Sequence, residues 1–305
     1  MRTSTDAEVT AFLKLARSMN ISVVLSPMLD PDWTLPTQLG CRSLSGARSR
    51  VDGKPNPGCY WRGQIGVYWP DDQICSSGEW STWHDNYDAW ILHWAALAES
   101  VGGVEAVVIA HELDRPILNC AARWAALVKD ARAVYSGQVG IASGGAVFGA
   151  DDATKAWVRS LSWLGYECYF GSSAPAPALP WEDAPLDDMK AGILKATEQV
   201  ASFAASLGLG VVCTEGGWLA APWASEAGWG NQFDQADYTT HFLSIWGPAQ
   251  ALAYEATISV VESQPWYLGS FFWFWRADPT AGGLSDPSAI PWATEATAAI
   301  AKMWL

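Results

Sequence analysis

The sequence predicts an α/β protein of the (βα)8 TIM-barrel type, and three observations lead to that class. Short β-branched or apolar runs alternate with amphipathic stretches of helical length along all 305 residues. Acidic and aromatic residues stand where several of the runs end, as on the carboxyl-end face of such a barrel. No glycine-rich phosphate loop follows the first run, which disfavours the alternative of a doubly wound open sheet.

A helix and a strand come first. Thr5 and Glu8 have the spacing of a capping box, and apolar residues then recur at helical intervals, which predicts a helix over about 6–19. The next run, 21–27, is β-branched and stops at Pro27 before an Asp-Pro-Asp turn, which indicates a strand.

A long loop is predicted over 30–81, where Gly, Pro, Ser, Cys and Trp are frequent and no period is sustained. Loops of this length inside compact domains tend to be functional. Because loops after strands gather at one face of a barrel, we expect this loop to fold over the acidic strand ends and to place Trp61 near the cleft.

The remaining chain keeps the same alternation. Helices are predicted near 82–100, 116–135, 152–161, 186–207, 236–262 and 292–303, and further strands near 105, 139, 163–170, 210 and 270. The Pro-rich stretch 174–177 is a loop rather than a linker, since the alternation resumes behind it, so one domain is expected over 1–305. The strands number about six, whereas a closed barrel has eight, which predicts an incomplete barrel.

The charge balance excludes two classes of partner. With 18 basic and 32 acidic residues the net charge is −14, which repels phosphate backbones and anionic lipid. Nucleic acid and membrane surfaces are therefore not expected partners. No apolar run reaches the roughly 18 residues of a membrane span, and no signal-peptide core follows Met1. We expect a soluble protein whose compartment, extracellular or not, is left open.

The abundance of tryptophan, much of it in loops, is compatible with a sugar-binding surface. The chain has 20 tryptophans, many of them beside loop residues, and a flat indole ring suits stacking against sugar rings. Core packing is the expectation for Trp124 and Trp157.

Of six cysteines, three lie in the long loop (Cys41, Cys59 and Cys75) and three near predicted helices and strands (Cys120, Cys168 and Cys213). One loop disulfide or free thiols are both open, and no metal-ligand spacing appears, so neither a metal nor a cofactor is expected.

Two strand-end glutamates carry the chemistry. Glu112 follows the apolar run 107–111, and Glu215 follows a β-rich run and precedes two glycines. A carboxylate at such a position costs desolvation energy unless it has a role or a partner. The pair suggests glycoside hydrolysis by a retaining enzyme, whose two carboxyl groups lie about 5 Å apart. A salt-bridged acid is the alternative for each. Tyr169 could donate to Glu215.

Four motifs carry a family resemblance over nearly the whole chain. They are Trp61-Arg62-Gly63-x-Ile65, Ile109-x-x-Glu112-Leu113, Thr214-Glu215-x-Gly217 and Phe272-Trp273-x-Trp275. With them the chain resembles the β-1,4-mannanases of glycoside hydrolase family 113 in clan GH-A.

This resemblance implies roles for the motif residues. It makes Glu112 the acid/base and Glu215 the nucleophile of an endo-acting β-1,4-mannan hydrolase. Substrate contacts are expected from five side chains, namely Trp61, Arg62, Tyr169, Trp218 and Trp275. Arg62 could instead be a structural ion-pair partner. His111 departs from the family pattern and either tunes Glu112 or packs beside it.

The family's first strand, first helix and second strand have no counterpart in this sequence. The strands near Val23 and Phe272 should therefore be the two edges of the sheet. We expect an opening between them or a homodimer contact that covers it. A carbohydrate-binding pseudoenzyme is the alternative function, and a phage or gene-transfer tail component is a third.

Overall fold

The protein is described from a computed structural model. The residues it describes are 4–29, 50–51, 54–55, 62–65, 75, 78–171, 186–218, 240–272, 297–298 and 300–301. They belong to two compact units, Met1–Gly165 and Tyr166–Leu305, and each is treated by itself below. The single domain expected from the sequence stays a prediction.

The strands of the main sheet follow one another in chain order. They are β1 (Val23–Leu25), β4 (Val104–His111), β5 (Gln138–Ser143), β6 (Trp163–Glu167), β7 (Val211–Glu215) and β8 (Tyr267–Ser270), and neighbours in this sequence are hydrogen-bonded. β1 pairs in parallel with β4, β4 with β5, and β7 with β8. Helices lie between consecutive strands, which is the plan of a (βα)8 barrel. Within the described residues this sheet has six strands, which confirms the incomplete barrel.

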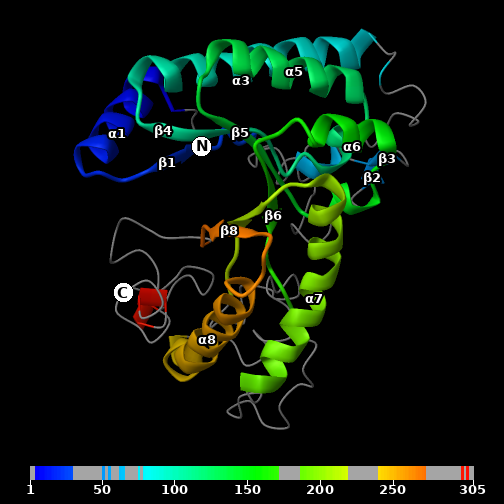
Figure 1. Ribbon diagram of the computed structural model, residues 1–305. Coiled ribbons are helices and arrows are strands. Elements are labelled where there is room, and N and C mark those ends of the chain that lie inside the picture. The colour runs from blue at the N-terminus through cyan, green and yellow to red at the C-terminus, as the bar shows by residue number, and fades with distance from the viewer. Residues whose placement is uncertain are drawn as a thin grey trace. The chain divides into compact units, whose positions relative to one another are not determined.

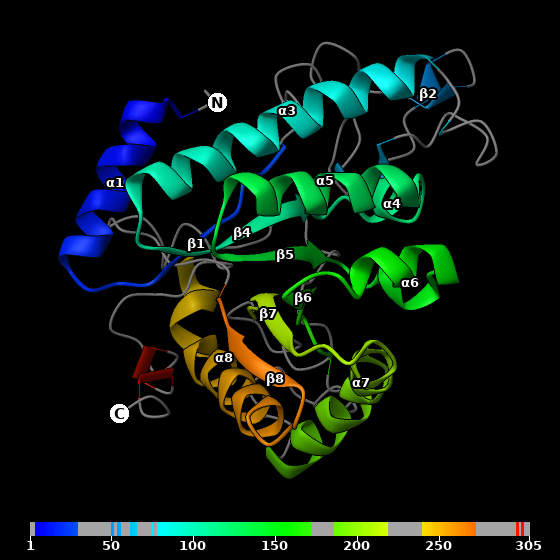
Figure 2. The ribbon, with the colours of Figure 1, turned by 45° about the horizontal axis from the view of Figure 1, so that its top comes forward.

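Helices accompany the strands in both units. Those of the first unit are α1 (Asp6–Ser18), α3 (Gly78–Val101), α4 (Asp114–Ile117), α5 (Ala121–Val134) and α6 (Asp152–Val158), with 3-10 turns η3 (Arg62–Gln64) and η4 (Ala146–Gly149). The second unit has α7 (Leu186–Leu207) and α8 (Thr240–Val261), which lie against each other (Figure 1). Figure 2 shows α3 beside α5 in the first unit.

The predicted first helix is confirmed together with its cap. The Thr5 side chain accepts from the backbone N–H of Glu8, and the Glu8 side chain accepts from the backbone N–H of Thr5. This reciprocal capping box satisfies two amide donors at the start of α1. The long loop contains more structure than the sequence suggested, because β2 (Arg50–Val51) pairs antiparallel with β3 (Lys54–Pro55). α3 also begins at Gly78, four residues before the predicted start.

The core of the first unit lies on both faces of β4. Val107, Val108, Ile109 and Ala110 are at most 1% exposed, as expected of a parallel strand that is covered on both sides. Trp124 on α5 stacks on Trp157 on α6 with ring centroids 5.8 Å apart. Core packing of these two tryptophans is thus confirmed.

The two sheet edges are the ones that the sequence predicts. β1 and β8 stand at the ends of the strand order. Large apolar side chains are exposed near each edge: Phe12, Leu15, Met19 and Ile21 in the first unit, and Leu268 and Phe271 in the second. A homodimer contact over an edge stays a prediction. None of the described helices is both long and apolar enough to cross a membrane.

Two disulfides are present among the described residues, and one of them joins cysteines from the two groups distinguished in the sequence. Cys75 from the long loop pairs with Cys120 at the start of α5, and Cys168 after β6 pairs with Cys213 on β7. Each pair has its Cα atoms 5.3 Å apart, within ordinary disulfide reach. Cys75 therefore has its partner outside the loop. Cys41 and Cys59 lie outside the described residues.

A glycine on β5 gives a stability prediction. A Cβ added at Gly140 would lie 2.6 Å from three ring carbons of Trp163, which is itself buried. We expect Gly140→Ala to lower the free energy of unfolding by about 1–3 kcal/mol through overpacking. Denaturant unfolding followed by tryptophan fluorescence measures the change.

Gly149→Ala is the matched control, because a Cβ there meets no atom within 4 Å. It should change the free energy of unfolding by no more than about 0.5 kcal/mol. Equal effects of the two substitutions would contradict this account of the β5 and β6 packing.

Candidate active site

The candidate site residues fall into two clusters, one in each unit. The Glu112 cluster consists of Ser26, Arg62, His111 and Glu112, and the Glu215 cluster consists of Cys168, Tyr169, Cys213 and Glu215.

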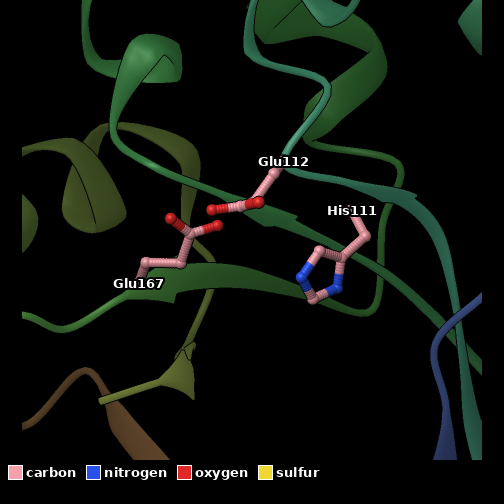
Figure 3. Close-up of side chains that lie close together, drawn as sticks. All are labelled: His111, Glu112 and Glu167. Atoms are coloured by element: carbon pink, nitrogen blue, oxygen red, sulfur yellow. The ribbon is translucent and has the colours of Figure 1, made fainter. Parts of the chain in front are cut away.

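Glu112 leaves its strand through an unusual backbone conformation. β4 ends at His111, and Glu112 has φ +49°, a left-handed value that is uncommon for a residue with a side chain. Its N–H still donates to the carbonyl of Ala142 at 2.9 Å, so the turn is anchored to β5. Strained backbone of this kind concentrates at functional sites. Figure 3 shows Glu112 and His111 next to each other at this strand end.

Arg62 is the ion-pair partner of Glu112. Its Nη1 donates to Glu112 Oε2, and its Nε donates to the carbonyl of Leu29 at 3.1 Å. Both side chains are mostly buried, with Glu112 14% exposed. The structural ion pair that the sequence left open for Arg62 is therefore present, and it compensates the buried charge of Glu112. A contact of Arg62 with substrate stays a prediction.

His111 has a hydrogen-bond partner just after the first strand, and a tuning of Glu112 by His111 stays a prediction. Its Nδ1 lies 2.8 Å from Ser26 Oγ, and the imidazole is buried. The donor in this hydrogen bond depends on the histidine tautomer. Ser26 lies 85 positions away, and nothing in its sequence surroundings singles it out as this partner.

Asp114 is a second buried acid that the sequence analysis missed. Its Oδ1 accepts from Ser143 Oγ at 2.9 Å and from the backbone N–H of Gly144 at 3.0 Å. Burial raises the pKa of Asp114, the negative charge of Glu112 adds to the rise, and the two hydrogen bonds offset part of it. Its position two residues after Glu112 was the available signal.

Glu215 is fixed by a tyrosine, as the sequence suggested. It is the last residue of β7 and is 8% exposed. The Tyr169 hydroxyl donates to Glu215 Oε2 at 2.8 Å, so the expected hydrogen bond is confirmed. The backbone N–H of Cys168 donates to the carbonyl of Glu215 at 2.7 Å. Both main chain and side chain of Glu215 are thus tied to the segment that follows β6.

Trp218 lies in the core of the second unit. Only 2% of it is exposed, its ring meets Tyr254 edge to face at 4.8 Å, and its carbonyl accepts from Gln250 Nε2 at 2.7 Å. Such burial leaves little of the indole face exposed, and a substrate contact of Trp218 stays a prediction. Trp61 and Trp275 lie outside the described residues.

Glu167 is a third acidic residue at the end of a strand. Glu167 is the last residue of β6 and is buried (Figure 3). The sequence analysis placed it inside a longer strand over 163–170, because the apolar pattern continues to Phe170. The same rule that selected Glu112 and Glu215, an acid where a buried strand stops, would have selected it.

Comparisons with known proteins show the family of the chain through a sequence model and its fold through solved structures. A sequence model of Glycoside Hydrolase Family 113 matches residues 55–283. The chain is similar to a solved family 113 β-1,4-mannanase complex, with a TM-score of 0.64 and 16% identity, covering 98% of this chain and 79% of the other. No curated protein sequence matches the chain.

Two further solved structures are similar. A family 113 β-mannanase from Alicyclobacillus acidocaldarius in complex with ManMIm has a TM-score of 0.66 and 16% identity, covering 99% of this chain and 78% of its own. A family 5 mannosidase from Rhizomucor miehei in complex with mannosyl-fructose has a TM-score of 0.60 and 12% identity, covering 96% and 73%. At these identities the likeness shows the fold.

The raised pKa of Asp114 gives a pH prediction. Because the folded state holds this proton more tightly than the unfolded chain, the free energy of unfolding falls as pH rises from the ordinary value of 3.8 through the higher folded pKa. Asp114→Asn removes the charge and keeps an oxygen for Ser143 and Gly144. We expect the variant to lose the part of this decrease in the free energy of unfolding that comes from Asp114. Denaturant unfolding at a series of pH values measures it.

Asp130→Asn, at an exposed position of α5, is the control and should leave the pH dependence as in the wild type. Parallel stability curves for the wild type and Asp114→Asn would contradict the assignment.

Proposed function

Because the chain belongs to glycoside hydrolase family 113, we propose that it is a retaining, endo-acting β-glycosidase that cleaves β-1,4-mannan-type chains. In this proposal Glu215 is the nucleophile and Glu112 the general acid and base. The observation that carries it is the Tyr169–Glu215 hydrogen bond at the end of β7, which holds a buried carboxylate in one orientation.

The proposed reaction has two steps. In the first, a Glu215 carboxylate oxygen attacks the anomeric carbon while Glu112 gives its proton to the glycosidic oxygen, and the bond to the leaving sugar breaks. In the second, Glu112 takes a proton from water, the water oxygen attacks the same carbon, and Glu215 is released. The mechanism requires the two carboxyl groups to lie about 5 Å apart, and this separation stays a prediction.

The electrostatics of the chain fit a neutral polymer. A net charge of −14 disfavours polyanionic substrates, nucleic acid and anionic membrane surfaces, whereas mannan-type chains carry no charge. The choice of mannan rests on the mannanases and the mannosidase among the similar structures. Trp61 and Trp275 remain the proposed sugar platforms, and no cofactor takes part.

The Arg62–Glu112 ion pair favours a second candidate, a carbohydrate-binding protein without turnover. A general acid has to carry a proton, whereas the ion pair uses the carboxylate form of Glu112. Hydrolysis requires a protonated Glu112 in spite of this ion pair. If Glu112 instead keeps its charge, the chain can bind sugar chains that are never cleaved.

Reducing-sugar release from mannan, glucomannan and β-1,4-glucan separates the two candidates. We expect the wild type to release sugar from the mannan substrates, and Glu112→Gln and Glu215→Gln each to lower kcat by about 100-fold or more. Glu105→Gln, at an exposed position of β4, is the matched control and should retain activity. Binding of mannan by the wild type without release of sugar would leave only the binding protein.

Rescue by azide assigns the two roles. With an activated aryl β-mannoside, azide should restore turnover to Glu112→Ala and give the β-glycosyl azide, because the covalent intermediate is still formed on Glu215. Glu215→Ala should instead give the α-glycosyl azide, since azide attacks the substrate directly from the side of the missing nucleophile. The opposite assignment of products would exchange the roles, and the anomer is read by NMR.

A further inference from the structure

Three ties join the end of β6 to the end of β7. The first is the disulfide between Cys168 and Cys213. The second is the hydrogen bond from the Cys168 N–H to the Glu215 carbonyl, 2.7 Å, and the third is the bond from the Tyr169 hydroxyl to Glu215 Oε2, 2.8 Å. All three involve Glu215 or the residue two positions before it on the same strand.

Cys213 is anchored independently of the disulfide. It lies within β7, pairs with Ser270 of β8, and its carbonyl accepts from the Phe271 N–H at 2.8 Å. Residues two apart on a strand project to the same face, so Cys213 and Glu215 share one side of β7. The Cys213 sulfur is therefore a fixed point close to the base of the Glu215 side chain.

Cys168 and Tyr169 lack the corresponding support of a strand. β6 ends at Glu167, and the Tyr169 N–H turns back to the Glu167 carbonyl at 2.9 Å. Tyr169 thus sits on a segment that has left the sheet, and the residue before it carries the covalent link to β7. The link therefore limits how far the tyrosine can move relative to Glu215.

We propose that the Cys168–Cys213 disulfide positions Tyr169 against Glu215, so that the activity of the protein depends on its redox state. The proposal rests on the proposed function in that Glu215 is taken as the nucleophile. Reduction by a dithiol breaks the S–S bond, leaves one thiol on each cysteine, and converts the dithiol to its own disulfide. Tyr169 then loses the covalent link between the neighbouring residue and β7, which leaves its hydrogen bond to Glu215 without that support.

The chain contains its own control for this reduction. The Cys75–Cys120 disulfide closes an equal sequence separation of 45 residues, but it joins neither β6 nor β7, and Cys75 is exposed. Cys168 and Cys213 are 2% and 1% exposed. A dithiol should therefore reduce the Cys75–Cys120 disulfide first. The product is a state in which the Cys168–Cys213 disulfide is still intact.

The direct test is a dithiol titration of the full chain. At each step, alkylation and peptide mass spectrometry show which cysteines are reduced, and kcat and KM are measured on a mannan oligosaccharide. We expect reduction of Cys75–Cys120 to leave kcat within about twofold, and reduction of Cys168–Cys213 to lower it about 10-fold or more, the effect of losing a hydrogen bond to a charged group. KM should change little, and reoxidation should restore kcat. An unchanged kcat after reduction of the second link would overturn the proposal.

A double-mutant cycle distinguishes positioning from general stabilisation. Tyr169→Phe should lower kcat about 10- to 100-fold, and in that background the further pair Cys168→Ala with Cys213→Val should have little additional effect. Cys75→Ser with Cys120→Ser is the matched control in both backgrounds. Effects of Tyr169→Phe and of disulfide loss that simply multiply would show that the two act independently, which contradicts the proposal.

A structural readout separates failure of this inference from failure of the proposed function. If the wild type hydrolyses no glycoside, the proposed function fails, and the crystal structure of the reduced protein still decides the inference. A Tyr169 Oη to Glu215 Oε2 distance that stays at 2.8 Å after reduction would overturn the positioning role. A break of this hydrogen bond would support it.

Discussion

The structure depends on how it compensates carboxylates that stand where buried strands end. Each such acid loses hydration on folding, and an uncompensated one would cost several kcal/mol. Glu112 is compensated by the Arg62 guanidinium, Asp114 by Ser143 and a backbone amide, and Glu215 by the Tyr169 hydroxyl. The partners differ in kind, an ion pair for one glutamate and a phenol for the other, so the two carboxyl groups stand in different electrostatic surroundings.

Local patterns in the sequence were sufficient to predict most of the helices and strands. The capping box of α1, the buried run of β4 and the acids at the ends of β4 and β7 depend on neighbours a few residues apart, and all were predicted. The Tyr169–Glu215 contact was also predicted, because the ends of parallel strands meet at one edge of the sheet.

Contacts between distant residues and unusual backbone geometry could not be predicted in the same way. The partner of His111 is 85 positions away. The partner of Cys75 is Cys120 at the start of α5, which lies next to the loop only in the folded chain. The burial of Trp218 depends on Tyr254 and Gln250 of α8, which its own neighbours in sequence do not indicate. The left-handed backbone of Glu112 has no sequence signal, since glutamate is not a residue that favours it.

The most direct test of the central claim, that Glu215 is the nucleophile of a retaining glycosidase, is to trap the covalent intermediate. A 2-deoxy-2-fluoro β-mannoside with a good leaving group should slow both steps and let the glycosyl-enzyme accumulate. Peptide mass spectrometry of the inactivated protein should then find the sugar on Glu215, and Glu215→Gln should remain unlabelled. Turnover of mannan with no covalent label, or a label on another residue, would contradict the account.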